Sequence, residues 1–186
     1  MKKKVALVIG AGTSLGSAVA RCFARDGLTA VVARRTGEEL STLKKEIEDF
    51  GGTCHPFSLD ARKEDDVINL INKIENEIGE IEVAVYNIGA NIKFGITETT
   101  SQKYYKVWEM AAFGAFLMGR EVAKKMIPRK KGTIIFTGAT ASVRGGDGFA
   151  AFAGAKHAKR ALAQSMAREL GPKGIHVAHV IIDGAI

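Results

Sequence analysis

The sequence has few cysteines and no long apolar run. Only two of its 186 residues are cysteines, Cys22 and Cys54, and they show no paired spacing. Such usage is typical of the reducing cytoplasm rather than of a secreted, disulfide-stabilised protein. No apolar stretch reaches the roughly 18 residues that a membrane-spanning helix needs. The composition therefore predicts a cytoplasmic protein with no membrane partner.

Lysine and arginine outnumber aspartate and glutamate by 27 to 20, and the formal net charge is +7. The lysine and arginine clusters at residues 2–4 and 129–131 lack the interleaved aromatic residues of a nucleic-acid site, so we interpret them as solvated surface. The basic start followed by the apolar residues 5–9 could also open a signal peptide. That apolar stretch is short and leads into a glycine-rich turn, so a first buried strand explains it better. Part of the basic excess could serve a phosphorylated cofactor.

Short β-rich runs alternate with longer segments of helical period, which predicts a parallel sheet with helices on both faces. We expect strands at residues 4–9, 29–33, 53–58, 83–87, 132–137 and 176–182, and helices at 15–25, 38–50, 63–78, 101–126 and 149–170. Right-handed crossovers then imply a doubly wound α/β sheet of order 3-2-1-4-5-6, in a single domain spanning residues 1–186. Ligands of such sheets bind at the carboxyl ends of the strands.

A glycine-rich turn follows the first expected strand and leads into the first helix; it reads Gly10-Ala11-Gly12-Thr13-Ser14-Leu15-Gly16. Gly10 would permit the tight turn, Gly12 a close approach of backbone to pyrophosphate, and Gly16 close packing of helix on strand. The helix N-terminus would offer free N–H groups to the phosphates. An ordinary glycine-rich turn is the alternative. Strand, helix and spacing together favour a dinucleotide site at this turn, including Ser14 and Leu15.

The second expected strand ends in Ala33-Arg34-Arg35, where folds that prefer NAD usually carry an acidic residue. A guanidinium can pair with a 2′-phosphate that an acidic side chain would repel. Arg34 and Arg35 therefore indicate NADP(H) in preference to NAD(H). The alternative is two solvated arginines at the end of a strand.

Taken in order, these motifs resemble the short-chain dehydrogenase/reductase family over essentially the whole chain. Ser14 stands where the family's glycine-rich motif has its middle glycine. The resemblance implies a Rossmann-like NAD(P)-binding domain in which Asp60 contacts the adenine, while Asn87 and Gly89 lie beside the cofactor. Asp60 could alternatively cap a helix. The resemblance also implies a homodimer or homotetramer, formed through the alanine-rich helices at 101–126 and 149–170.

The family's catalytic tetrad is degenerate in this sequence. The Tyr-x-x-x-Lys motif reads Phe152-Ala153-Gly154-Ala155-Lys156, so only the lysine remains. Ala139 lies 13 positions before Phe152, where the family has serine, and Ala111 lies three before Gly114, where it has asparagine. The resemblance implies that Lys156 can still bind the nicotinamide ribose. It has no tyrosine hydroxyl whose pKa it can lower.

Two function classes remain open. The first is an atypical NADP(H)-dependent oxidoreductase acting on a small carbonyl or enone, in which another group donates the proton; the candidates are Thr140, Ser142, Tyr86, Tyr104 and Tyr105. The second is a non-catalytic NADP(H)-binding sensor or partner subunit. A missing proton donor costs about 10²–10⁴ in rate, which favours the second, while the family resemblance favours the first. We prefer the oxidoreductase.

Metal chemistry has little support. His176 and His179 lie three apart on an expected strand, so their side chains point to opposite faces, and we expect no metal site. The resemblance further implies that a substrate-covering region should follow the sixth strand, whereas this sequence ends at Ile186. The C-terminal part of the family fold is therefore expected to be absent, and the substrate is not predicted.

Overall fold

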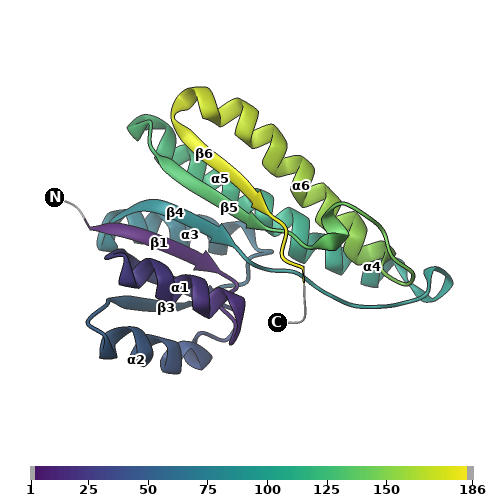
Figure 1. Ribbon diagram of the computed structural model, residues 1–186, viewed down its shortest axis with the longest axis horizontal. Helices are drawn as coiled ribbons and strands as arrows, with labels where there is room; N and C mark the ends of the chain where they lie inside the picture. The colour runs from purple at the N-terminus through teal and green to yellow at the C-terminus, as the bar shows by residue number, and fades with distance from the viewer. Residues whose placement is uncertain (1–2, 184–186) are drawn as a thin grey trace.

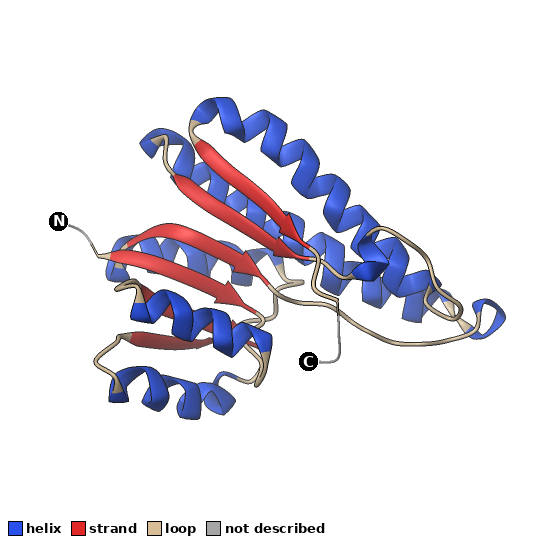
Figure 2. Ribbon diagram, in the orientation of Figure 1, coloured by secondary structure: helices blue, strands red, loops and turns tan. Residues whose placement is uncertain are grey.

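The sheet is fully parallel. The computed structural model describes residues 3–183, so the first two residues of the basic start and the last three residues of the chain lie outside the described part. The strands are β1 (Lys4–Ile9), β2 (Thr29–Arg34), β3 (Cys54–Ser58), β4 (Glu80–Tyr86), β5 (Gly132–Thr137) and β6 (Ile175–Val180). They pair in the order β3-β2-β1-β4-β5-β6 (Figures 1 and 2). The predicted doubly wound topology is confirmed.

Helices cover both faces of this sheet. The long helices are α1 (Leu15–Arg25), α2 (Ser41–Asp49), α3 (Glu64–Lys73), α4 (Ser101–Trp108), α5 (Gly114–Met126) and α6 (Ala150–Leu170). Leu7 of β1 is buried in one apolar cluster with residues of α3, α5 and α6, while its neighbour Val8 is buried in a second cluster with residues of α1 and α2. Successive side chains of a strand point to opposite faces, so each strand contributes to both layers.

The helix expected at 101–126 is interrupted. A π-helical turn, η4 (Glu109–Phe113), separates α4 from α5, and a second π-helical turn, η2 (Ile74–Ile78), ends the helix expected at 63–78. A π turn shifts the backbone bonding by one residue without breaking the helical run, so apolar spacing does not reveal it. In η4 the carbonyl oxygen of Met110 accepts a hydrogen bond from the Tyr86 hydroxyl at 2.6 Å. The prediction of one continuous helix was therefore wrong in this detail.

Other boundaries differ from the expectation by a few residues. The sixth strand ends at Val180 rather than at 182, and β4 begins at Glu80 rather than at 83. A 3-10 turn, η1 (Gly37–Leu40), precedes α2, and another, η7 (Gly171–Lys173), follows α6 and contains Pro172, which cannot continue the helix. Among the described residues, no helix is long and apolar enough to cross a membrane.

Candidate active and cofactor site

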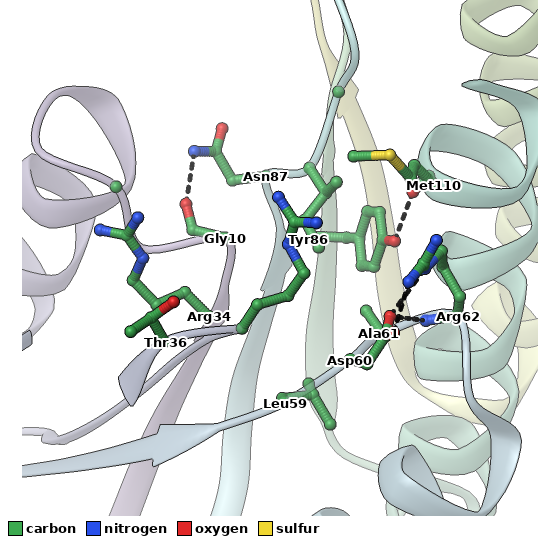
Figure 3. A pocket seen from close by; sticks show the side chains of 14 residues that line it. Gly10, Arg34, Thr36, Leu59, Asp60, Ala61, Arg62, Tyr86, Asn87 and Met110 are labelled. Carbon is green, nitrogen blue, oxygen red and sulfur yellow. Dashed lines mark hydrogen bonds and ion pairs between the residues drawn. The ribbon is translucent and has the colours of Figure 1, made fainter. Parts of the chain in front are cut away.

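A pocket of about 420 Å³ lies where the carboxyl ends of β1, β2 and β4 meet (Figure 3). The residues predicted for the cofactor that line it are Gly10, Gly12, Arg34, Arg35, Asp60, Asn87 and Gly89. Its other lining residues are Thr36, Leu59, Ala61, Arg62, Tyr86, Ile88 and Met110. The topology thus brings together side chains that are far apart in the sequence, at the edge where doubly wound sheets bind ligands.

The glycine-rich turn is tightly packed at two of its glycines and open at the third. Gly10 has φ +91°, and a β-carbon there would lie 2.9 Å from the carbonyl carbon of Asn87. A β-carbon on Gly16 would overlap the carbonyl oxygen of Gly10 and lie 2.8 Å from Cα of Ala11. A β-carbon added to Gly12 would have no heavy atom within 4 Å among the described residues other than its neighbours in the chain. Gly10 and Gly16 are therefore required by packing, and Gly12 faces open space in which a ligand can approach the backbone.

Ser14 and Leu15 do not line this pocket. Ser14 is the N-cap residue of α1, and its side chain makes no capping hydrogen bond. Leu15 lines a separate apolar hollow of about 230 Å³, together with Val85 and Ile182. Any role of these two residues at a cofactor must therefore come from their position at the start of α1 and not from contact with the pocket.

The two arginines after β2 differ in their partners. Nη2 of Arg34 lies 2.6 Å from Oε2 of Glu39, so its charge is already paired. Arg35 is exposed at the pocket and has no hydrogen bond or ion pair within residues 3–183. Arg35 is consequently the guanidinium that remains available to an anionic group.

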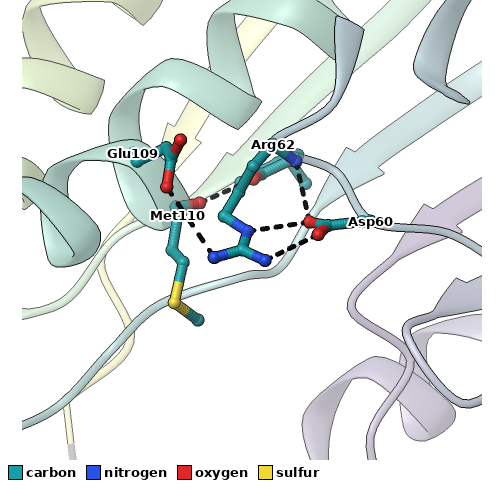
Figure 4. Close-up of polar contacts among 5 residues, drawn as sticks. Asp60, Arg62, Glu109 and Met110 are labelled. Carbon is teal, nitrogen blue, oxygen red and sulfur yellow. Dashed lines mark hydrogen bonds and ion pairs between the residues drawn. The ribbon is translucent and has the colours of Figure 1, made fainter. Parts of the chain in front are cut away.

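Asp60 is bound by a residue that the sequence analysis missed. Arg62 donates to both carboxylate oxygens of Asp60, through Nε at 2.8 Å and Nη2 at 2.6 Å, and its backbone N–H donates to Oδ1 at 3.2 Å. Nη1 of Arg62 lies 3.7 Å from Glu109 (Figure 4). This pairing holds the pKa of Asp60 below its usual value. Asp60 does not cap α3, whose N-cap residue is Lys63.

Asn87 and Gly89 connect the end of β4 to the rest of the site. The side-chain amide of Asn87 donates to the carbonyl oxygen of Gly10 at 3.0 Å, which fixes the glycine-rich turn against β4. A β-carbon on Gly89 would lie only 3.1 Å from Nζ of Lys156. The absence of a side chain at Gly89 thus lets Lys156 reach the edge of the cofactor pocket.

A second pocket, of about 360 Å³, lies beside the start of α6. Phe152, Ala139 and Thr140 line it, with Arg144 and others. Nζ of Lys156 lies 5.4 Å from the centre of the Phe152 ring and donates to the carbonyl oxygen of Thr137 at 3.2 Å. Burial lowers the pKa of Lys156. Lys156 lines neither pocket, but its buried amine contacts one lining residue of each, Gly89 and Phe152.

The family model for short-chain dehydrogenases matches residues 4–184. The chain belongs to the short-chain dehydrogenase family. A short-chain dehydrogenase from Rhodopseudomonas palustris shares 52% identity with it, with a TM-score of 0.94 over 97% of this chain and 85% of that one. A variant of actinorhodin polyketide ketoreductase, solved with NADPH, shares 27% identity, with a TM-score of 0.92 over 96% of this chain and 69% of that one.

Curated relatives are longer than this chain. "Short chain aldehyde dehydrogenase 1" of Euphorbia lathyris is 30% identical over 95% of this chain. The chain spans 62% of the length of that relative. Oxidoreductase chemistry is thus the activity found among the short-chain dehydrogenases that it resembles, and the activity of the whole protein is a matter for proposal.

Three of the residues suggested as alternative proton donors, Ser142, Tyr86 and Thr140, differ in the hydrogen bonds of their hydroxyl groups. Ser142 Oγ already accepts from the backbone N–H of Ala139 at 3.1 Å. Tyr86 is fully buried, its hydroxyl donates to Met110, and burial raises its pKa. Oγ1 of Thr140 is buried and has no hydrogen-bond partner within the described residues. Thr140 is therefore the one of these three whose hydroxyl oxygen has no hydrogen-bond partner in the described part of the chain, and it lines the same pocket as Phe152.

Tyr104 and Tyr105 lie elsewhere on α4, and neither lines either pocket. The Tyr104 hydroxyl lies against Gly154 of α6, 2.9 Å from where a β-carbon would stand. Tyr105 is exposed and stacks on Trp108 with ring centres 6.1 Å apart. Their positions argue against a role as proton donors.

The position that we aligned with the family's asparagine lies in apolar packing. Ala111 lies in the π turn η4, is fully buried, and forms a small cluster with Ala151 and Ala155 of α6. Sequence reasoning also missed Lys159, which is fully buried one turn after Lys156 on α6. A lysine among alanines on an otherwise apolar helix face was the signal that could have identified it.

Proposed function

We propose that this chain holds NADP(H) in the pocket at the glycine-rich turn and transfers hydride between it and a small carbonyl or enone compound in the second pocket. The observation that carries the proposal is the position of Lys156, whose buried amine lies beside Gly89, a lining residue of the first pocket, and beside Phe152, a lining residue of the second. Membership of the short-chain dehydrogenase family supports it.

The pocket residues fit such a cofactor. Gly12 leaves open space at the start of α1, where N–H groups and the helix dipole favour phosphate. The unpaired Arg35 supplies a cation for a 2′-phosphate, and Lys156 can donate to the nicotinamide ribose. When bound, the nicotinamide supplies or accepts the hydride. Similar solved structures hold NADPH in one case and NAD⁺ in another, so the proposed preference for NADP(H) rests on Arg35.

Proton delivery distinguishes this site from that of its relatives. Phe152, Ala139 and Ala111 carry no acidic proton, so we expect slow reduction of simple carbonyl compounds. The same observation favours a second candidate function, a non-catalytic NADP(H)-binding sensor or partner subunit.

The purified protein, incubated with NADPH and a panel of aldehydes, ketones and enones, tests both functions. Consumption of NADPH that depends on the substrate supports the oxidoreductase. Tight binding of NADPH without consumption supports the sensor. Failure to bind either nicotinamide dinucleotide in titration calorimetry would contradict both.

We further propose that the protein forms a homodimer or homotetramer through α5 and α6. An apolar groove of about 320 Å³ runs between these helices, and the half-exposed Phe116 and Ile127 line it. Apolar helix faces of this kind pack against a symmetry mate in closed oligomers. Light scattering at micromolar concentration measures the assembly, and the mass of a single chain would count against it.

A further inference from the structure

Lys159 is buried without an acidic partner. Its side chain is fully buried; Nζ donates to the carbonyl oxygen of Ile88 at 3.0 Å and lies 5.4 Å from the centre of the Tyr86 ring. Lys156, one helical turn earlier, is also buried. No ion pair within residues 3–183 includes either lysine. A buried ammonium without a counter-charge is costly, so a lysine in this position tends to lose its proton.

The acidic side chains on neighbouring elements are paired with other residues. Titratable and charged side chains near the two lysines include Tyr86 on β4, Tyr104 on α4, Glu109 in η4, His157 and Arg160 on α6, and His179 on β6. On α5, Glu121 pairs with Arg120 and Lys124, and on β4, Glu82 pairs with Lys4 and Lys131. Glu109 pairs with Arg62 instead. Burial and the nearby cations lower the pKa of His179 to about 4, so this imidazole is neutral at pH 7. Two ammonium groups here would repel each other without compensation.

The two amines are not equivalent. Burial lowers the pKa of both, and the charge of Lys156 lowers that of Lys159 further. The proximity of the two amines acts in opposite directions: it raises the pKa of Lys156 and lowers that of Lys159. A neutral amine at Lys159 can accept from the ammonium of Lys156 and still donate to Ile88. The pair is therefore arranged to keep its proton on Lys156, the lysine that contacts Gly89 and Phe152.

We propose that Lys156 and Lys159 hold a single proton between them and that Lys156 donates it to the oxygen of a carbonyl substrate, in the place of the missing tyrosine. This role rests on the proposed function. Hydride from the reduced nicotinamide dinucleotide forms the new C–H bond, the carbonyl π pair moves to oxygen, and the Nζ–H bond of Lys156 breaks as the O–H bond forms. The products are an alcohol and the oxidised dinucleotide, and the lysine regains its proton from water.

Lys159 would act as a positioning residue, because it sets the proton affinity of Lys156. One test reads the charge state directly, with and without NADPH, from the NMR signals of lysines labelled with ¹³C at Cε. At pH 7 we expect one lysine signal with the shift of a neutral amine, and we expect it to be absent from Lys159→Met. Lys106→Met, which removes an exposed lysine of α4, is the matched control and should keep the signal. Ordinary ammonium shifts for every lysine at pH 7 would overturn the inference.

A second test follows the pH dependence of single-turnover reduction. Donation by Lys156 requires its charged form, so the rate should fall as pH rises through the pKa of Lys156. Lys159→Met removes the acceptor and should move the fall of the rate at high pH by about one pH unit to lower pH. At a given pH within that fall, the rate should then be about tenfold lower than in the wild type. Lys159→Gln keeps an acceptor, so its rate should fall at nearly the same pH as in the wild type. Lys159→Arg adds a fixed positive charge and should move the fall of the rate furthest to lower pH.

The two tests separate this inference from the proposed function. Circular dichroism and NADPH affinity confirm that each variant is folded and binds. An active enzyme whose rate falls at the same high pH in all three variants overturns the role of Lys159 while the oxidoreductase stands. A protein that shows the neutral amine but never consumes NADPH overturns both the donor role of Lys156 and the oxidoreductase.

Discussion

The two halves of the sheet differ in the side chains that they bring to the two pockets. The half made of β1, β2 and β3 carries the glycine-rich turn, the unpaired Arg35 and the Asp60–Arg62 pair around an open pocket. The half made of β4, β5 and β6 carries the buried Lys159 and Phe152, which we aligned with the family's proton donor. On that alignment we expect the features for binding to be kept and those for proton transfer to be changed, so function must be tested separately in each half.

The largest expected effect comes from restoring the family residues in the second half. Phe152→Tyr with Ala139→Ser should raise turnover of simple aldehydes and ketones by about 10²-fold or more, since the phenol would lie beside Lys156, which lowers its pKa. NADPH oxidation measures it. Phe149→Tyr adds a hydroxyl in the same pocket, with ring centres 6.4 Å from Phe152, and should give no comparable gain. A wild type that already reduces aldehydes briskly would contradict our interpretation of Phe152.

The sequence predicted the two halves unequally well. Buried strands read as continuous apolar runs, and the carboxyl ends of parallel strands must meet, so the topology and most of the pocket at Gly10 followed from pattern alone. The π turn at Met110 did not follow, because a shift of one residue leaves the apolar spacing nearly unchanged. The sequence pattern also did not predict the partners of Arg62 and Lys159, because an ion pair or a buried amine depends on which side chains meet in three dimensions.

The second effect should appear in the binding half. Arg35→Ala should lower the affinity for NADPH by roughly 10- to 100-fold and leave that for NADH nearly unchanged, because charge-assisted hydrogen bonds to the 2′-phosphate are lost. Titration calorimetry with both nucleotides measures the ratio. Arg34→Ala is the matched control, since Arg34 already pairs with Glu39, and it should change the ratio less. An unchanged ratio in the double variant would show that neither arginine selects NADPH.

The third effect concerns the hydrogen bond between Tyr86 of β4 and Met110 of the π turn η4. Tyr86→Phe removes the hydroxyl that donates to Met110 and leaves that carbonyl oxygen of the π turn without this partner. We expect the free energy of unfolding to fall by about 1–2 kcal/mol. Urea denaturation measures it, with Tyr105→Phe as the control, because Tyr105 is exposed on α4 and should leave stability unchanged. Equal stability of the two variants would mean that the π turn needs no support from β4.

The smallest effect is the pH dependence of the Asp60–Arg62 pair. Asp60→Asn should lower stability at pH 7 by about 1 kcal/mol, since the carboxylate is only 19% exposed and is bound through both oxygens. The folded state lowers the pKa of Asp60, so the wild type should keep this advantage above about pH 4 and lose it as pH falls through the folded pKa.

Urea midpoints of the wild type and Asp60→Asn between pH 2 and 7 measure how this advantage changes. Asp49→Asn, which removes the exposed pair with Lys45 on α2, is the control and should change stability little at any pH. If Asp60→Asn matches the wild type at pH 7, the pair does not support the fold. Arg62 would then be held at the pocket for its ligand rather than for stability, and NADPH affinity should fall in Arg62→Ala.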